Sequence, residues 1–303
     1  MDKEQDCIVI LDYKRVNAKL LIIITGPHGL LGREVVKVFK KEFDVVELPH
    51  DVLDITDLNQ VREVLSIHAP RLLINCAAYT AVDKAEEETE KANLVNGLGV
   101  RNLALVCKEL DIILVHISTD YVFDGQSGKP WRIFDERNPI NAYGYSKYLG
   151  ERYLETINPK YYLVRTSWLF GSGGPNFVST ILRAAAKQSE LRVVNDQFGC
   201  PTYAPDLASA LLKLVKTGAY GVYHMTNQGV TSWYEFAKEI IKKADIKIPV
   251  IPVSSDEYVR PAKRPKNSAL DPFPLQETVG CLLPCWQDAL SRFLVEIKAK
   301  ELS

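Results

Sequence analysis

The feature that most constrains the fold of this chain is a regular alternation, in its first half, of short apolar runs with stretches of helical period. The apolar runs cover residues 20–25, 44–48, 71–75, 112–118 and 161–166. Between them, apolar residues recur at helical spacing, first at Leu31, Val35, Val38 and Phe39 and then over 57–68, 95–110 and 143–157. Strands that alternate with helices form parallel sheets with helices on both faces. The sequence therefore predicts an α/β fold with a doubly wound parallel sheet, whose ligand site lies at the carboxyl ends of the strands.

The second half breaks this rhythm after Trp168 and predicts a smaller α+β unit. Ser232 and Glu235 form a capping box for a helix that runs to about residue 243. The other expected elements are helices over 176–187, 205–216 and 287–298, strands over 191–195 and 221–224, and a proline-rich loop over 252–274. We divide the chain into a first domain over 19–166 plus about 201–218, and a second domain over about 167–200 and 219–303. Residues 1–18 are either a leader or an added strand.

Composition and charge exclude several classes of protein. Lys and Arg total 37 and Asp and Glu total 38, so we expect neither a nucleic-acid nor a membrane partner. The longest apolar run is far below the roughly 18 residues that span a bilayer, and the acidic N-terminus is unlike a signal peptide. The six cysteines form no CxxC pair and no cluster of zinc spacing, which predicts no metal site and a reducing compartment. We therefore expect a cytoplasmic protein.

A glycine-rich loop joins the first predicted strand to the first predicted helix. Its glycines, Gly26, Gly29 and Gly32, permit a tight turn and let a pyrophosphate approach the backbone at the helix N-terminus. An ordinary glycine-rich turn is the alternative, but the strand before and the helix after favour a dinucleotide site. The residues of this loop that we assign to the cofactor are Gly26, His28, Gly29, Leu30 and Leu31.

The end of the second predicted strand bears on the choice of dinucleotide. NAD enzymes place an acid there to bind the ribose 2′-hydroxyl, whereas this chain has Pro49 and His50. Glu47 can serve only if the strand ends earlier, and Arg33 and His50 can meet a 2′-phosphate. We therefore favour NADP(H) and leave NAD(H) open. Asp54 and Ile55 are assigned to the adenine pocket, with a helix-capping turn as the alternative for this segment.

Tyr143 and Lys147 are four residues apart and share one face of a predicted helix. Because a nearby ammonium stabilises a phenolate, we expect Lys147 to lower the pKa of Tyr143 and make it a proton donor to a carbonyl oxygen. Thr119 follows the strand over 112–118, at the sheet edge that carries the ligand site, and can hydrogen-bond the same oxygen. A surface Tyr/Lys pair is the alternative. The neighbouring Asp120 is assigned to the substrate, with loop capping as its alternative.

These residues resemble the extended short-chain dehydrogenase/reductase family, and within it the sugar-nucleotide reductases, over about residues 20–294. The segments that carry the resemblance are 26–32, 75–83, 95–96, 118–125, 143–151, 165–168, 196–202, 232–236 and 264–271. The last four are more specific than the glycine loop, because they separate these reductases from the related epimerases and dehydratases. The resemblance implies a Rossmann-type first domain and a substrate-binding second domain.

The resemblance also implies roles for individual residues. Thr119, Tyr143 and Lys147 would be the catalytic triad, with Lys147 also holding the nicotinamide ribose, and Asn96 would support the site. The cofactor would be flanked by Cys76, Ala77 and Ala78, and the sugar nucleotide by Tyr79, Val82, Asp120, Trp168, Gln197, Thr202 and Arg264. Four of these have structural alternatives: interdomain packing for Trp168, a loop contact for Gln197, a surface ion pair for Arg264 and a bond within the helix for Asn96. No acidic triad was found, so a role for magnesium stays open.

The implied activity is the NAD(P)H-dependent reduction of the C4 ketone of a dTDP-4-keto-6-deoxy sugar, with dTDP-L-rhamnose as the product for polysaccharide synthesis. Two alternatives stay open on the same fold. One is a sugar-nucleotide epimerase or dehydratase with tightly held NAD, and the other is a non-catalytic NADP-binding regulatory subunit. The partner is a small nucleotide sugar, and a homodimer is left open.

Overall fold

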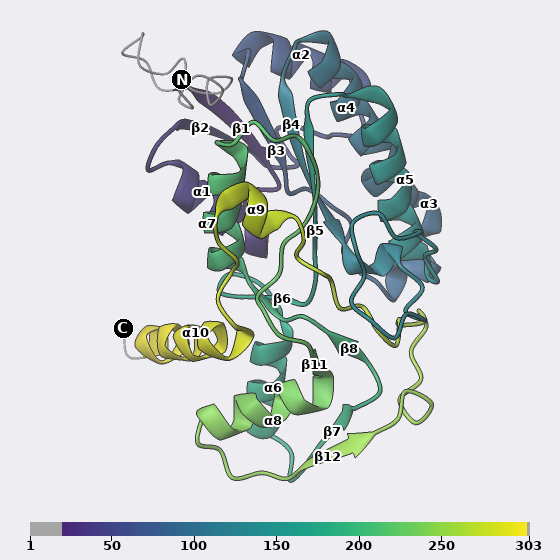
Figure 1. Ribbon diagram of the computed structural model, residues 1–303, viewed down its shortest axis with the longest axis vertical. Coiled ribbons are helices and arrows are strands. Elements are labelled where there is room, and N and C mark those ends of the chain that lie inside the picture. The colour runs from purple at the N-terminus through teal and green to yellow at the C-terminus, as the bar shows by residue number, and fades with distance from the viewer. Residues whose placement is uncertain (1–19, 302–303) are drawn as a thin grey trace.

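The fold is built on one six-stranded sheet in which all neighbouring strands are parallel (Figure 1). The computed structural model describes residues 20–301, so the prediction for residues 1–18 lies outside the described residues. The strand order is β10-β5-β4-β3-β1-β2. The bounds are β1 Leu21–Thr25, β2 Asp44–Leu48, β3 Leu72–Asn75, β4 Ile113–Thr119, β5 Tyr161–Thr166 and β10 Gly221–His224. The apolar runs of the first half form β1 to β5, which confirms the predicted parallel sheet.

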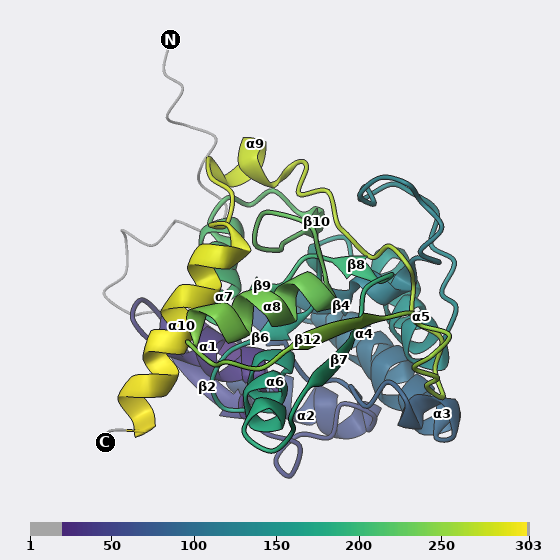
Figure 2. The same ribbon diagram turned by 90° about the horizontal axis from the view of Figure 1, so that it is seen from below.

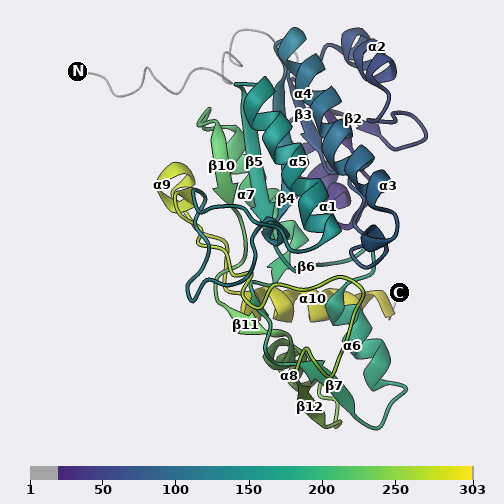
Figure 3. The same cartoon turned by 90° about the vertical axis from the view of Figure 1, so that its right-hand side faces the viewer.

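Alternate side chains of the strands fill a core on each face of this sheet. Ile22 and Ile24 pack under one pair of helices, α1 (Leu30–Phe39) and α7 (Ala204–Val215). Ile23 packs on the opposite face, which is covered by α2 (Leu58–His68), α4 (Val100–Glu109) and α5 (Ala142–Ile157) (Figure 3). Because successive side chains of a strand point to opposite faces, a strand buried on both sides is apolar at every position rather than at alternate ones.

A π-helix, η3 (Leu94–Gly99), lies where the sequence predicted the first turns of one continuous helix over 95–110. A Cβ atom at Gly99 would lie 2.8 Å from Cγ1 of Ile55, so the absence of a side chain there lets the segments pack closely. The charged stretch before it, residues 83–91, forms η2 (Lys84–Glu86) and α3 (Thr89–Asn93). Single π-turns within helices are frequent at functional sites.

The smaller unit follows the carboxyl end of β5 and lies beyond that end of the sheet (Figures 1 and 2). Three phenylalanines pack together at its centre. The ring centroid of Phe170 lies 5.8 Å from that of Phe236 and 5.6 Å from that of Phe293. Its helices are α6 (Phe177–Ala185), α8 (Trp233–Lys243) and α10 (Trp286–Glu301). Its paired strands are β6 (Leu169–Phe170) with β9 (Thr202–Tyr203), β7 (Leu191–Val194) with β12 (Val250–Val253), and β8 (Phe198–Gly199) with β11 (Thr231–Ser232).

Several details of the second half differ from expectation, among them the short strands β6, β8, β9, β11 and β12, for which no strand was predicted. β10 pairs with β5 in the main sheet, although residues from 219 onward were assigned to the second domain. α9 (Leu275–Val279) was not predicted, because five residues are too few to show a helical period. Ser232 caps α8 as expected by accepting a hydrogen bond from the Glu235 N–H at 3.1 Å. In the described part of the chain, no helix is both long and apolar enough to cross a membrane.

Candidate active site

The loop between β1 and α1 forms a glycine cradle at the carboxyl edge of the sheet. Gly26 has a φ of +62°, and a Cβ atom on it would lie 2.7 Å from the backbone nitrogen of Ala77. Only glycine fits this position, because a side chain would be both strained and in collision with the end of β3. α1 then begins at Leu30 with no side-chain cap, so its first N–H groups can bind an anion. This cradle fits the pyrophosphate of a dinucleotide.

The strip that follows β3 is tied to the same cradle. The Asn75 side chain is fully buried, and its Oδ1 accepts hydrogen bonds from Thr25 Oγ1 at 2.7 Å and from the Ala77 N–H at 3.2 Å. These bonds hold Cys76, Ala77 and the loop after β1 side by side. Burial raises the pKa of the Cys76 thiol to about 12, so this cysteine is a neutral wall of the site and not a nucleophile.

Asn96, in the π-helix η3, joins this strip to the catalytic helix. Its Oδ1 accepts from the Tyr79 N–H at 2.8 Å, and its Nδ2 donates to the Tyr79 carbonyl at 2.9 Å and to Ser146 Oγ at 2.9 Å. The Ser146 hydroxyl in turn donates to the Tyr143 carbonyl at 2.7 Å. Asn96 therefore bonds the backbone of a different segment and not the inside of its own helix, which was its alternative; that it supports the site stays a prediction.

Tyr143 and Lys147 lie in the first two turns of α5, which Asn141 caps by accepting from the Gly144 N–H at 2.7 Å. Lys147 is 2% exposed, and its Nζ donates to the Ile117 carbonyl in β4 at 2.6 Å. Burial lowers the pKa of Lys147 to about 8, although the Glu151 carboxylate acts in the opposite direction. The amino group therefore titrates close to neutral pH.

Thr119 ends β4, two residues after the carbonyl that holds Lys147. Its hydroxyl donates to Asp120 Oδ1 at 2.9 Å and accepts from the Tyr121 N–H at 3.2 Å. Burial raises the pKa of Asp120 to about 7, against the hydrogen bonds from Ser268 and Thr119, which lower it. The rings of Tyr121 and Tyr143 meet edge to face with centroids 6.0 Å apart. The end of β4 thus lies against the start of α5, as a shared carbonyl-binding site requires.

The expected effect of Lys147 on Tyr143 is wrong for the groups of this chain. Burial raises the pKa of Tyr143 to about 12, the Thr119 hydroxyl lowers it, and the Asp120 carboxylate raises it further. The groups that shift this pKa are thus the buried surroundings, Thr119 and Asp120, and not Lys147. Tyr143 therefore keeps its proton throughout the neutral range, which suits a proton donor.

The structure gives the residues assigned to the adenine pocket other contacts. The Asp54 carboxylate accepts from the Thr56 N–H at 2.9 Å and from the Thr56 hydroxyl at 2.8 Å, in the turn before α2. The residue of this segment that caps α2 is Asp57, which accepts from the N–H groups of Asn59 and Gln60. Ile55 is 4% exposed and packs in the core beneath α2 and α4. A contact of Asp54 or Ile55 with adenine stays a prediction.

The segments that carry Arg264 and Val82 meet at Asp83, the neighbour of Val82. Arg264 pairs with Asp83 at 2.9 Å, as its alternative proposed, and its charge also acts on the pKa of Tyr121, beside Tyr143. Arg264 is thus near Tyr143 as well as paired. Val82 is partly buried next to Asp83, and the Tyr79 hydroxyl donates to Glu88 at 3.2 Å.

Trp168, Gln197 and Thr202 come from the smaller unit. Trp168 has a φ of +47° and stacks on Trp233 with ring centroids 3.4 Å apart, so packing accounts for part of its role. Gln197 donates to the Ser255 hydroxyl at 2.9 Å, a contact between two loops. Thr202 is fully buried and its hydroxyl donates to the Cys200 carbonyl at 3.2 Å. Their contacts with a sugar nucleotide stay predictions.

Sequence reasoning missed a group of buried polar residues behind the site. His116, in the middle of β4, contacts both Asn75 and Lys147. Glu151, one helical turn after Lys147, binds Ser118 at 2.6 Å and Arg165 at 2.8 and 2.9 Å. The signal in the sequence was a polar residue, His116, inside an apolar run. Its partners Lys147 and Asn75 are 31 or more residues away in the chain, so no local pattern points to them.

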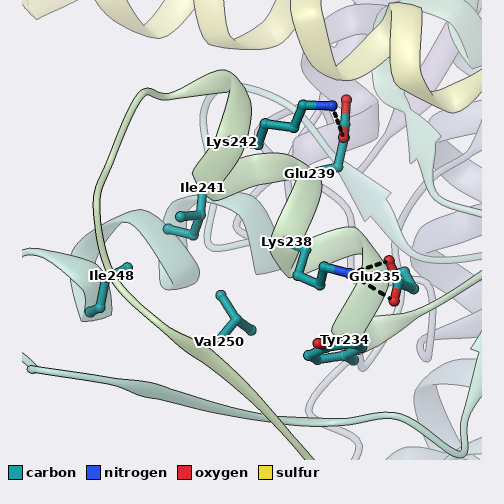
Figure 4. A pocket seen from close by; sticks show the side chains of 8 residues that line it. All are labelled: Tyr234, Glu235, Lys238, Glu239, Ile241, Lys242, Ile248 and Val250. Atoms are coloured by element: carbon teal, nitrogen blue, oxygen red, sulfur yellow. Dashed lines mark hydrogen bonds and ion pairs between the residues drawn. The ribbon is translucent and has the colours of Figure 1, made fainter.

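Two further features bear on sites elsewhere in the molecule. Among residues 20–301, no group of three or more His, Cys, Asp or Glu side chains is placed to hold a metal ion. An open pocket lies beside α8 in the smaller unit, and two of its lysines pair with glutamates of the same helix, Lys238 with Glu235 and Lys242 with Glu239 (Figure 4). We assign no function to this pocket.

Comparison with known proteins is consistent with this site. The model of the RmlD substrate binding domain matches residues 20–299. A dTDP-4-dehydrorhamnose reductase from Aggregatibacter actinomycetemcomitans is 40% identical, over 89% of this chain and 96% of the relative. A dTDP-4-keto-6-deoxy-D-glucose reductase from Streptomyces niveus is 38% identical, over 92% and 98%. The crystal structure of a Bacillus anthracis dTDP-4-dehydrorhamnose reductase in complex with NADP superposes with a TM-score of 0.89 at 42% identity, over 92% of this chain and 99% of that one. This chain therefore belongs to the dTDP-4-dehydrorhamnose reductase family of extended short-chain dehydrogenases/reductases.

Proposed function

We propose that this protein reduces the C4 ketone of a dTDP-4-keto-6-deoxy sugar with NADPH, converting dTDP-4-dehydro-L-rhamnose to dTDP-L-rhamnose for polysaccharide synthesis. The observation that carries the proposal is the contact of the Thr119 hydroxyl with Tyr143 at the carboxyl end of β4. Lys147 is held on the Ile117 carbonyl of the same strand, and the glycine cradle lies at the same edge of the sheet. The named relatives, at about 40% identity over nearly the whole chain, support the same substrate class.

The bound nicotinamide supplies a hydride, and the chain's own groups handle the oxygen and the proton. Tyr143, whose pKa is raised to about 12, donates its proton to the C4 oxygen as the ketone becomes an alcohol. Thr119 steadies that oxygen with its hydroxyl, which also acts on Tyr143. Lys147, held against β4 on the same helix as Tyr143, is positioned to bind the nicotinamide ribose.

The preference for NADPH rests on the residues around the end of β2. Glu47, the only acid near that end that was considered for the 2′-hydroxyl, pairs with Lys40 at 2.6 Å and is therefore already engaged. His50 and Arg33 lie in exposed positions from which they can meet a 2′-phosphate, and Arg33 Nε donates to the His28 carbonyl at 2.8 Å. The NADP complex of the Bacillus anthracis relative supports this preference.

The substrate is proposed to lie between the sheet edge and the smaller unit. We assign the sugar and its diphosphate to Tyr79, Val82, Asp120, Trp168, Gln197, Thr202 and Arg264, and the cofactor flank to Cys76, Ala77 and Ala78. The proximity of Arg264 to Tyr121 supports this arrangement, because it brings a guanidinium to the cleft that holds Tyr143. Cytoplasmic location and a homodimer stay predictions.

The test is an assay of purified protein with NADPH and dTDP-4-dehydro-L-rhamnose, followed by NMR of the product sugar. We expect NADPH oxidation that depends on the ketosugar and yields dTDP-L-rhamnose. A product with the opposite configuration at C4 would support the assignment as a reductase but change the identity of the product sugar. Protein that carries bound NAD and works without added NADPH would instead indicate an epimerase or dehydratase. NADPH binding without turnover of any ketosugar would indicate a regulatory subunit.

A further inference from the structure

His116 is a fully buried polar residue in the middle of the apolar strand β4, and the mechanism above does not use it. Its ring lies between Asn75, whose Nδ2 is 3.0 Å from Nδ1, and Lys147, whose Nζ is 3.4 Å from Nε2. A buried imidazole lowers the free energy of unfolding unless both its nitrogens are satisfied, so each contact needs a physical account.

The orientation of the Asn75 amide decides which proton the His116 ring carries. The Ala77 backbone N–H can only donate, so the Asn75 atom that faces it at 3.2 Å is the oxygen Oδ1. The Thr25 hydroxyl donates to the same oxygen at 2.7 Å. The amide nitrogen must therefore face His116, and it donates a hydrogen bond to Nδ1.

Since Nδ1 accepts, the single proton of the neutral imidazole is on Nε2, the nitrogen that faces Lys147. The ring is neutral, because burial lowers the pKa of His116 well below its usual value, and a charge on Lys147 acts in the same direction whenever the amine is protonated. When the Lys147 amine is neutral, its lone pair can accept a hydrogen bond from Nε2–H. When the amine is protonated it has no lone pair, and the N–H dipole repels it. The Ile117 carbonyl accepts a hydrogen bond from the same Nζ at 2.6 Å.

We propose that His116 is a positioning residue: held by Asn75 and Thr25, it directs its Nε2–H at Lys147, keeps Nζ against the Ile117 carbonyl and opposes protonation of the amine. Two other groups face Lys147. Glu151 in α5 and Cys76 after β3 favour the ammonium when they are ionised, whereas burial disfavours it. His116 is thus the neighbour whose hydrogen bonding counters Glu151. The effect on turnover rests on the proposed reductase function, but the state of the ring does not.

The first test is therefore independent of activity. The chain has five histidines, so ¹⁵N-histidine labelling and two-bond ¹H–¹⁵N spectra can resolve each ring, and the His116→Gln protein identifies the His116 signals by their loss. We expect His116 to be the neutral Nε2–H tautomer from pH 6 to pH 9. A ring protonated on Nδ1, or on both nitrogens, overturns the proposal.

The second test is the pH dependence of kcat/KM for NADPH in wild type and in His116→Gln. The glutamine amide can turn its carbonyl toward Nζ and accept from the ammonium, so the alkaline limb should move upward by about 0.5–1 pH unit. His116→Asn is the second variant, because its shorter amide can contact Asn75 without reaching Nζ. For this variant we expect a smaller upward shift and a raised KM for NADPH.

The matched control is His224→Gln. His224 is also fully buried, but it contacts Arg165 at 3.2 Å and the Asp271 carbonyl at 3.1 Å rather than Lys147. The His224→Gln substitution should lower the free energy of unfolding and leave the alkaline limb of the kcat/KM profile in place. An unmoved limb in both His116 variants, or an equal shift in His224→Gln, overturns the proposal. If wild type does not turn over the ketosugar, the proposed function fails. The same comparison is then made on the pH dependence of NADPH binding, measured by nucleotide fluorescence.

Discussion

Tyr143, Lys147 and Asp120 are all buried near the carboxyl end of β4, and burial is the largest influence on the pKa of each. It raises the pKa of the phenol and of the carboxyl and lowers that of the amine, so all three shift toward the uncharged form. Groups shifted in this way can hold protons for transfer at neutral pH.

Removal of the Tyr143 hydroxyl tests its role as proton donor. Tyr143→Phe should lower kcat by about 10²–10⁴-fold, because the alkoxide then lacks a positioned acid. The Kd for NADPH should change by less than about twofold, since the ring and helix are kept. Stopped-flow NADPH oxidation and fluorescence titration measure the two quantities. Tyr145→Phe, on the same helix and 46% exposed, is the control and should behave as wild type. Equal turnover in both variants would exclude Tyr143 as the donor.

Asp120 predicts a pH dependence of stability. Its pKa rises from an ordinary 3.8 to about 7, so between these values the folded state holds a proton that the unfolded state has lost. Its contribution to the free energy of unfolding is therefore present at low pH and declines as pH rises from about 4 to about 7. Asp120→Asn lacks this proton equilibrium. Urea unfolding at pH 4 to 8 should show Asp120→Asn gaining stability relative to wild type as pH rises; a constant difference would contradict the shift.

Helix α5 is held in register by a buried ion pair, which matters because it carries both Tyr143 and Lys147. Glu151 is fully buried and Arg165 is 1% exposed; they bond through both oxygens of the carboxylate, at 2.9 and 2.8 Å. Ser118 and Arg137 complete the shell of Glu151 at 2.6 and 2.9 Å. These bonds join α5 to β4 and β5, and thereby set the depth of the catalytic residues in the cleft.

Breaking the Glu151–Arg165 pair should destabilise the folded protein, because this pair holds α5 against the sheet. Glu151→Gln should lower the free energy of unfolding by about 3–5 kcal/mol, because the Arg165 guanidinium is left buried without its partner. Denaturant unfolding followed by circular dichroism measures the change. The control is Glu155→Gln, whose side chain also pairs with Arg137 but is 25% exposed, and which should cost less than about 1 kcal/mol. Similar losses in the two variants would show that α5 does not depend on the buried pair.

At the scale of the whole molecule, the glycine cradle couples cofactor binding to global stability. A ligand that binds only the folded state adds about 2.7 kcal/mol at 100 times its Kd. NADPH should therefore raise Tm by several degrees, and NADH at the same concentration by less.

Gly26→Ala should abolish this rise, because its Cβ atom would lie 2.7 Å from the Ala77 nitrogen in the cradle. Gly218→Ala is the matched control: φ is +71°, close to the +62° of Gly26, but no atom lies within 4 Å of the added Cβ. It should share the backbone strain and keep the response to NADPH. Thermal unfolding with and without nucleotide tests both variants. If Gly26→Ala keeps the rise in Tm with NADPH, the cradle is not part of the cofactor site.

The sequence by itself determined the parts of this protein that depend on local patterns. Helical spacing and short apolar runs predicted β1 to β5 to within a residue, because burial on both faces makes each strand apolar throughout. The glycine loop and the spacing of Tyr143 and Lys147 are also local, so both could be placed on the correct element and edge.

Only the tertiary structure decided the properties that depend on residues far apart in the chain. Asn96 bonds Tyr79, His116 lies between Asn75 and Lys147, and β10 joins the main sheet beside β5. The direction of the Tyr143 pKa shift belongs here too, because it depends on how deeply the ring is buried and on the nearby Asp120 carboxylate. A one-dimensional pattern specifies which face of an element is buried, whereas the partners that a buried polar group finds there depend on packing in three dimensions.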